Sequence, residues 1–447
     1  MFAEFIVIVE TTSAERSRTA DRAGHARAIM IVTACMVAFA IVFPRSTTTL
    51  FLIPAVVALA AWFVLPAVRM RGFPLNAVSL AVLGFAGWSL LSAGWSAAPL
   101  ASLTKPLFMI AGAAGIAVLA GIARDSEPEI LAAAGHGILF GFLGGAAMVC
   151  FETVTDQAIS QWFVNTFAKL REGFEKQLIM KDGVVVRISD TNINRRATVV
   201  TLLMAPAALL LTTLAESAFR RWATALFVAI CAILLVFSSH QSSQAAILAG
   251  AIAFGLAKLT PAWTCRSLAA AWCAACLLVV PFASLLHNAN LHKNDAVFNS
   301  ARHRVVIWNA TAEGVKKSPV IGIGADATAT LTLIQKKAQE AAGTVVKDGA
   351  YDVTTGRHAH NVFLQVWYEL GGIGALLFLV AGLASLAQCM KAPAKAQPFL
   401  LAQFAVVAAM IAFSFSVWQL WLQGAVGLGL IAILTALAAP AFQKVAR

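Results

Sequence analysis

The stretch HAHNVFLQVWYELGG, residues 358–372, points to the fold of this 447-residue chain, because it carries ionisable side chains directly into a hydrophobic run. In a helix, Asn361, Gln365 and Glu369 recur every four residues and form one polar stripe roughly 12 Å long. Ionisable groups are costly in lipid, so their presence here favours a functional role. The alternative is a polar face that packs on a neighbouring helix through hydrogen bonds. That alternative does not explain an imidazole pair at the water boundary.

The composition of the whole chain also indicates a membrane protein. Apolar residues make up 60% of the sequence and charged residues 12%, about half the charge of an ordinary soluble domain. We therefore predict an all-α polytopic membrane protein with about twelve transmembrane helices. The predicted spans lie near residues 28–43, 49–68, 74–94, 104–123, 130–151, 197–215, 222–238, 243–257, 267–287, 361–388, 398–417 and 420–442.

Lysine and arginine residues predict the orientation. They gather in the N-terminal 27 residues and in alternate loops, which places both termini in the cytoplasm. Residues 1–27 are then a cytoplasmic tail, polar and disordered over 10–27, and Phe2 to Val9 is too short for a removable signal peptide. The net charge of +12 reflects this bias and argues for membrane topology, not for nucleic acid.

Two long segments, 152–196 and 288–360, face the opposite side. They separate three groups of spans, at 28–151, 197–287 and 361–447. None of the seven cysteines lies in either segment, so packing and not disulfides must hold them. Cys273 and Cys276, inside an apolar run, are interpreted as small packing residues and not as a redox or metal pair.

The first outward segment has helical apolar spacing from Ile159 to Leu178. This pattern predicts an amphipathic helix on the membrane surface, and a lid helix packed only on protein fits the periodicity equally well. Arg195 and Arg196 close the segment just before the sixth span. Arginines are expected on the cytoplasmic side of a membrane, so two of them at an outward boundary indicate a role other than fixing the orientation.

The second outward segment, 288–360, is predicted to be largely helical and is basic. Arg302, Arg304 and Trp308 lie on one predicted helix, and the adjacent Lys336 and Lys337 lie on another. The run Pro319–Gly324 between them is a turn, since it lacks the strand and the Lys-Ser/Thr of a phosphate loop. Neither a zinc spacing nor an acidic metal motif is present, so no metal or other cofactor is predicted.

These residue types suit the transfer of a group from a pyrophosphate. The chain offers no convincing outward carboxylate pair, which a glycosidase would need to protonate its leaving group. Guanidinium groups bind pyrophosphate bidentately without a metal, and a histidine can deprotonate the acceptor hydroxyl. Such a set is available in Arg195, Arg196, Arg302, Arg304 and His360.

At this point the motifs resemble those of the O-antigen ligase and polymerase superfamily. The resemblance rests on His358-x-His360-Asn361 with Glu369-x-Gly371, on Arg304-x-x-x-Trp308 and on Pro319-x-x-Gly322-x-Gly324. Asn194-Arg195-Arg196 and Ser242-Ser243-Gln244-Ala245-Ala246 add to it, so it covers roughly residues 190–375. It implies a GT-C type membrane architecture and a metal-independent transfer of polysaccharide from undecaprenyl pyrophosphate. With a base facing the departing pyrophosphate across the sugar, attack would be in line, so we expect the anomeric configuration to invert.

The resemblance also implies roles for particular residues. His360 would be the general base, with His358 as its rival, and Arg304 matches the family's arginine. Arg195 and Arg196 compete for a further position. Asn361, Glu369, His358 and Arg302 are expected to contact substrate, and Lys336 and Lys337 to bind an anionic acceptor. A product of retained configuration would instead require a covalent intermediate, with Glu369 the first nucleophile to suspect.

The expected member is an O-antigen ligase of the bacterial inner membrane, with its site facing the periplasm. Its partners would be the undecaprenyl-pyrophosphate-linked O-antigen, lipid A–core oligosaccharide and the bilayer. An O-antigen polymerase and a protein O-oligosaccharyltransferase stay open as alternatives. A transporter is the alternative of another class, but transporters place ionisable residues near the bilayer midplane in related halves, whereas here they cluster at one face.

Overall fold

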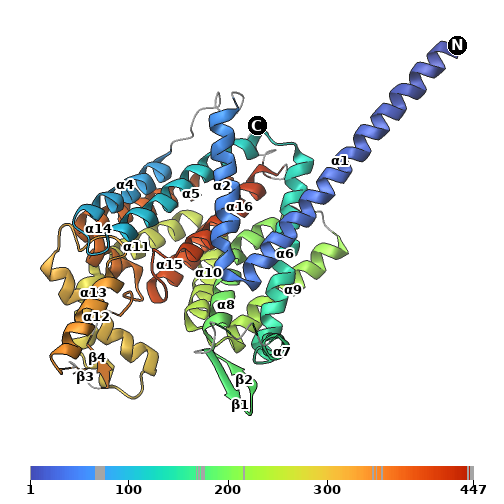
Figure 1. The fold of residues 1–447 in the computed structure, drawn as a ribbon. Helices are drawn as coiled ribbons and strands as arrows, with labels where there is room; N and C mark the ends of the chain where they lie inside the picture. Colours follow the sequence, from blue (N-terminus) through green and yellow to red (C-terminus); the bar gives the residue numbers. More distant parts are fainter. Residues whose placement is uncertain are drawn as a thin grey trace.

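A computed structural model (Figure 1) describes residues 2–65, 76–167, 169, 172, 177–214, 217–344, 347–348, 350–353, 356–439 and 442. The predicted all-α polytopic architecture is confirmed: in these ranges eleven helices are long and apolar enough to cross a membrane. A shorter apolar helix, α15 (Gln397–Phe413), occupies the eleventh predicted span. The eleven long helices are α1 (Phe2–Val42), α2 (Thr47–Val64), α4 (Ala77–Leu91), α5 (Pro99–Asp125), α6 (Pro128–Val154), α8 (Thr191–Leu211), α9 (Ala218–Phe237), α10 (Gln241–Leu259), α11 (Pro261–Asn288), α14 (Val362–Lys391) and α16 (Leu420–Ala438).

Two boundaries differ from the prediction in ways that matter. Residues 10–27, expected to be disordered, belong to the continuous helix α1. Helix α15 ends at Phe413 and not near 417, because Ser414 leaves the helical region at φ −134° and ψ −69°. The connector from Ser414 to Gln419 is therefore free to contribute its polar groups elsewhere.

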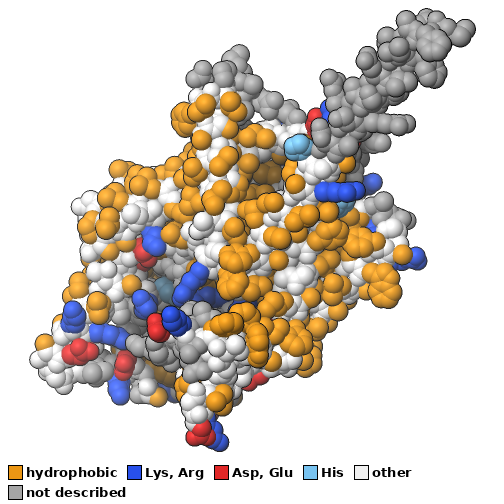
Figure 2. Space-filling model, turned by 45° about the vertical axis from the view of Figure 1, so that its right-hand side comes forward, with side chains coloured by type: hydrophobic (Ala, Val, Ile, Leu, Met, Phe, Trp, Pro, Cys, Tyr) orange, Lys and Arg blue, Asp and Glu red, His pale blue; other side chains and the backbone are white. Residues whose placement is uncertain are grey.

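Close helix contacts organise the bundle. Gly137, Gly141 and Gly145 recur every four residues on α6, and a Cβ on each would meet α1, at 1.9 Å from Thr33 Oγ1 for the first. Small residues at this spacing let two membrane helices approach closely. Helix α8 is the most buried span, whereas α9 and α11 present apolar side chains such as Trp222 and Leu278 to their surroundings. The wide apolar surface in Figure 2 fits contact with lipid.

The segments outside the spans lie at one end of the bundle (Figure 1). They are α7 (Ala158–Thr166), β1 (Leu178–Lys181), β2 (Val184–Ile188), η5 (Leu291–Lys293), α12 (Asn299–Lys317), α13 (Thr328–Ala341), β3 (Lys347–Asp348) and β4 (Tyr351–Asp352). Two one-turn 3-10 helices, η1 (Pro44–Ser46) and η2 (Ser92–Gly94), flank spans. Strands β1 and β2 form one antiparallel hairpin, and β3 and β4 form another.

The helix predicted from Ile159 to Leu178 is wrong at its far end. Helix α7 covers only Ala158–Thr166, Leu178 begins strand β1, and residues 168, 170, 171 and 173–176 lie outside the described residues. The missed signal is Asp182-Gly183, whose φ angles of 49° and 77° suit a two-residue hairpin turn. Asn165 of α7 ties the hairpin down, since its amide group pairs with Val185 N and O at 2.8 and 2.9 Å.

Candidate active site

The His358–Asn361 turn enters α14 in a fixed conformation. Asn361 caps the helix, with its side-chain oxygen accepting from Leu364 N at 3.1 Å. His360 adopts the left-handed conformation, at φ 54°. Ala359 is fully buried, and its carbonyl accepts from Trp308 Nε1 of α12 at 2.8 Å. Trp308 and the helix cap together set the directions of both imidazoles.

Hydrogen bonds assign different protonation to the two histidines. His360 Nδ1 lies 3.0 Å from the carbonyl of Ser414, which only accepts, so Nδ1 carries the proton and Nε2 keeps a lone pair. His358 Nδ1 accepts from the His360 backbone N–H at 3.2 Å, so its proton is on Nε2. The ring centres are 4.1 Å apart. His360 therefore presents a basic nitrogen, whereas His358 presents a donor.

A third histidine completes the cluster. His240 precedes α10, and its Nδ1 lies 2.8 Å from Ser243 Oγ while its Nε2 lies 3.3 Å from Ser414 Oγ. Ser414 thus contacts both His240 and His360. Thr198 Oγ1 of α8 lies 3.5 Å from His240 Nδ1, so the N-terminal part of α8 also borders the histidine cluster.

Burial keeps these imidazoles neutral. Burial, followed by the positive groups around it, lowers the pKa of His358 to about 3, and burial and Arg304 lower the pKa of His240 to about 4. Burial also lowers the pKa of His360; the hydrogen bond to Ser414 opposes this shift, and Arg304 and His303 add to it. At neutral pH His360 is therefore an uncharged base.

Arg304 of α12 is the cation of this cluster. Its charge acts on His240, His358 and His360, and no carboxylate pairs with it among the described residues. Burial lowers its pKa, yet a guanidinium stays charged at neutral pH. A partly buried cation without a partner is costly, so the site is suited to an anion. Lys and Arg side chains gather in the lower part of the face in Figure 2, away from its apolar expanse.

The adjacent arginines of α8 have different surroundings. Arg196 is occupied by the protein: Nε donates to Val42 O at 2.9 Å, and Nη1 pairs with the fully buried Glu152 at 3.2 Å. Arg195 has no ion pair within the described ranges, and its charged neighbour is Arg45 of η1. Of the two, Arg195 has the guanidinium available to an added anion.

The other predicted contact residues are more peripheral. Arg302 forms an ion pair with Asp295 at 2.5 Å. Lys336 and Lys337 are exposed on α13, where a soluble or membrane-anchored acceptor can reach them. The side-chain oxygen of Asn361 already accepts the capping hydrogen bond at the start of α14.

Glu369 is enclosed by protein. Its carboxylate is 1% exposed and accepts from Asp326 N at 3.2 Å, from Thr328 Oγ1 at 2.5 Å and from Trp418 Nε1. These donors lie just after the Pro319–Gly324 loop and in the connector before α16. The contacts favour a role in holding that loop over direct contact with substrate.

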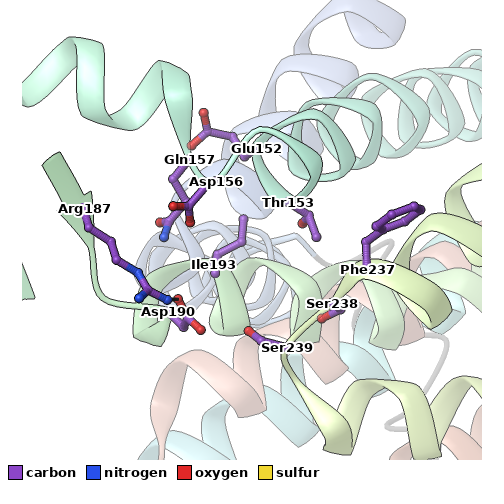
Figure 3. A pocket seen from close by; sticks show the side chains of 10 residues that line it. All are labelled: Glu152, Thr153, Asp156, Gln157, Arg187, Asp190, Ile193, Phe237, Ser238 and Ser239. Carbon is purple, nitrogen blue, oxygen red and sulfur yellow. Dashed lines mark ion pairs between the residues drawn. The ribbon is translucent and has the colours of Figure 1, made fainter.

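A separate cavity of about 210 Å³ lies on another side of α8 (Figure 3). In the close-up, Arg187 extends toward Asp190, with which it makes a 4.0 Å ion pair, while Glu152 and Asp156 lie across the opening. None of the histidines lines it, and its carboxylates do not suit a pyrophosphate.

Part of the sequence matches a known family. Residues 225–379 match the family model described as O-antigen ligase. The chain carries an O-antigen ligase family domain. Members of this family are glycosyl-transferring ligases and polymerases, which implies lipid-linked glycan substrates. No curated protein matches the chain.

The O-antigen ligase family domain runs from α9 to just past the middle of α14. It includes His240, Arg304, the Pro319–Gly324 loop and the His358–Asn361 turn, whereas Arg195 lies before it. The site thus joins the family domain to α8.

Sequence analysis missed three residues that border this candidate site. His240 is one of eight histidines in the chain, and nothing in its sequence surroundings singled it out. Arg45 did carry a signal, since it is an arginine in an outward loop that otherwise has little charge. Ser414 carried none, because it contacts His360 through its backbone carbonyl, which any residue supplies.

Proposed function

We propose that this protein is an O-antigen ligase that transfers polysaccharide from undecaprenyl pyrophosphate to lipid A–core oligosaccharide at the periplasmic face of the inner membrane. One observation carries the proposal: Arg304, which pairs with no carboxylate among the described residues, places its charge close enough to act on three neutral imidazoles, one of which presents a free Nε2. The cation suits a pyrophosphate, and the imidazole suits a hydroxyl.

In the proposed reaction, Arg304 and Arg195 hold the donor pyrophosphate. His360 Nε2 takes the proton of the acceptor hydroxyl, whose oxygen attacks the anomeric carbon. The bond from that carbon to the pyrophosphate oxygen breaks, and undecaprenyl pyrophosphate leaves with the electron pair. A base facing the leaving group across the sugar gives inverted configuration. No metal ion takes part in this scheme.

The remaining residues support the reacting groups. His358 Nε2–H is placed to donate to the glycan or pyrophosphate, and Arg302 and Asn361 border the cluster. Glu369 holds the loop that lies beneath the cluster. Its carboxylate already accepts several hydrogen bonds from the protein, which argues against Glu369 acting as a nucleophile. Lys336 and Lys337 suit an anionic acceptor, which favours lipid A–core over a growing neutral glycan. A polymerase of the same family is the second candidate.

The test compares His360→Gln with His358→Gln in purified protein supplied with lipid-linked glycan. Glutamine at 358 can still accept from the backbone and donate outward, so activity should fall only modestly. Glutamine at 360 can still donate to Ser414 but cannot take a proton, and turnover should fall about 10²–10⁴-fold. Near-normal turnover in His360→Gln removes it as the base.

The acceptor and the product complete the test. Transfer to lipid A–core but not to free glycan supports the ligase, and the reverse result supports the polymerase. A linkage of retained configuration in the product would contradict the single displacement.

A further inference from the structure

A second cluster of ionisable side chains lies at the end of α11. His287 Nε2 is 2.5 Å from Asp348 Oδ2, and His292 Nε2 is 3.1 Å from Asp348 Oδ1. The two rings are parallel, with centres 4.4 Å apart and 3° between their planes. Both Nε2 atoms therefore project to the same side, toward one carboxylate.

We propose that His287, His292 and Asp348 form a structural site for a divalent transition metal ion, with zinc the favoured occupant. The three groups can each offer one ligand atom, and these atoms lie within 4.8 Å of one another. Zinc takes imidazole nitrogens and carboxylate oxygens at about 2.0–2.2 Å, so small side-chain shifts around a central ion satisfy the geometry.

The donor set limits the choice of metal. Two imidazoles and one carboxylate suit zinc or a neighbouring transition metal, whereas magnesium and calcium prefer oxygen ligands throughout. His292 is 3% exposed, so the surrounding protein holds this ligand in place. The side chains of His287 and Asp348 are 23% and 24% exposed, which leaves a path for the ion and a position for water.

The placement explains what such an ion would do. Asp348 belongs to the β3–β4 hairpin, whose strands are two residues each, and so short a hairpin is not stable alone. On its other side Tyr351 donates to Asn299 of α12 and stacks on His303. The outward segments contain no cysteine, so no disulfide can fasten the hairpin. A metal ion would fasten it to the end of α11, just before the His358–Asn361 turn.

The site is distinct from the proposed catalytic chemistry. None of the three ligands hydrogen-bonds to the described residues of the His358–Asn361 turn or to Arg304. The metal is expected to affect stability and not to enter the reaction, so the proposal stands whether or not the protein is a ligase.

The experiment uses the full-length protein in detergent, purified through a tag without histidines and stripped with a chelator. Zinc is titrated while bound metal and the thermal unfolding midpoint are measured. The expected result is one zinc ion per chain and a rise in the midpoint. Both effects should be lost in Asp348→Asn and in His292→Gln.

Asp352→Asn is the matched control, because Asp352 lies in the same hairpin and is exposed. It should bind zinc like the unchanged protein. Zinc binding that persists in both ligand variants would place the ion elsewhere. Absence of binding by the unchanged protein at micromolar zinc would show that the three side chains form only a hydrogen-bonded latch.

Discussion

At the residue scale, the carbonyl of Ser414 distinguishes two histidines that look equivalent in sequence. The His-x-His-Asn pattern correctly placed an imidazole pair at the start of a span, but it did not predict that Asn361 caps the helix. It could not show which nitrogen carries a proton, because that depends on a backbone group 54 residues away. Long-range contacts of this kind leave no local signal.

Arg304 provides the sharpest test at this scale. Arg304→Lys keeps the positive charge but loses the planar fork that matches a pyrophosphate, so donor binding and turnover should fall at least tenfold. Activity and donor affinity are measured on protein that inserts and elutes normally.

The matched control for this change is Arg187→Lys, because Arg187 lies on β2 and forms only a surface ion pair, with Asp190. That variant should keep full activity. If Arg304→Lys is equally active, Arg304 acts only as a packing charge.

The pH dependence follows from the environment of His360. A base must be unprotonated, and burial lowers the pKa of this imidazole, so it stays unprotonated to lower pH than an ordinary histidine. The acid limb of kcat/KM is therefore expected below the ordinary value of about 6.5. A limb at or above that value would mean that another group titrates, or that His360 is solvated in the working protein.

At the element scale, the break in α14 explains why two separate motifs occur together. At Gly371 the helix has φ 66° and ψ −166°, which frees backbone groups on both sides. The Pro319–Gly324 loop forms hydrogen bonds with these groups. Gly324 N donates to Glu369 O at 2.8 Å, and Gly372 N donates to Pro319 O at 2.8 Å. Sequence analysis found the turn and the Glu-x-Gly motif but could not show that they hydrogen-bond to each other.

Gly371→Ala tests this pairing. A side chain at this backbone conformation costs about 1–3 kcal/mol, and a Cβ would also lie 2.2 Å from Val320 O. The variant should unfold at a lower temperature and lose activity along with the loop.

Gly372→Ala is the neighbouring control for this element. Its Cβ would meet nothing closer than 3.4 Å and its φ is not positive, so it should behave like the unchanged protein. Equal stability of the two variants would contradict the role given to the break.

At the scale of the whole molecule, hydropathy was sufficient for the fold class, and charge gave an orientation that stays a prediction. Twelve apolar runs correspond to eleven long helices and the shorter α15. The two hairpins were missed because their few residues alternate too briefly to stand out. The outward position of 152–196 and 288–360 is testable with single cysteines in a cysteine-free background.

Cysteines at Lys181 and Lys337, both exposed, should react with a membrane-impermeant thiol reagent once the outer membrane is permeabilised. A cysteine at Lys258, exposed in the last turn of α10, should react only after the inner membrane is broken. The opposite pattern would invert the topology and place the proposed site on the wrong side for a periplasmic acceptor.

The break at Gly371 also determines how far the first part of α14 extends beyond the part that is long enough to cross a membrane. Exposed apolar side chains on α14, such as Leu376 and Val380, begin only after it. Residues 372–391 give a helix of about 30 Å, enough to cross the hydrocarbon, and residues 362–370 add a stub of about 13 Å. If residues 372–391 cross the hydrocarbon along the bilayer normal, His360 at the tip of that stub would lie at or just beyond the water edge of the headgroup layer. Only the first isoprene units of a carrier would then lie level with the protein's polar groups, and the length of the remaining tail would matter little to turnover.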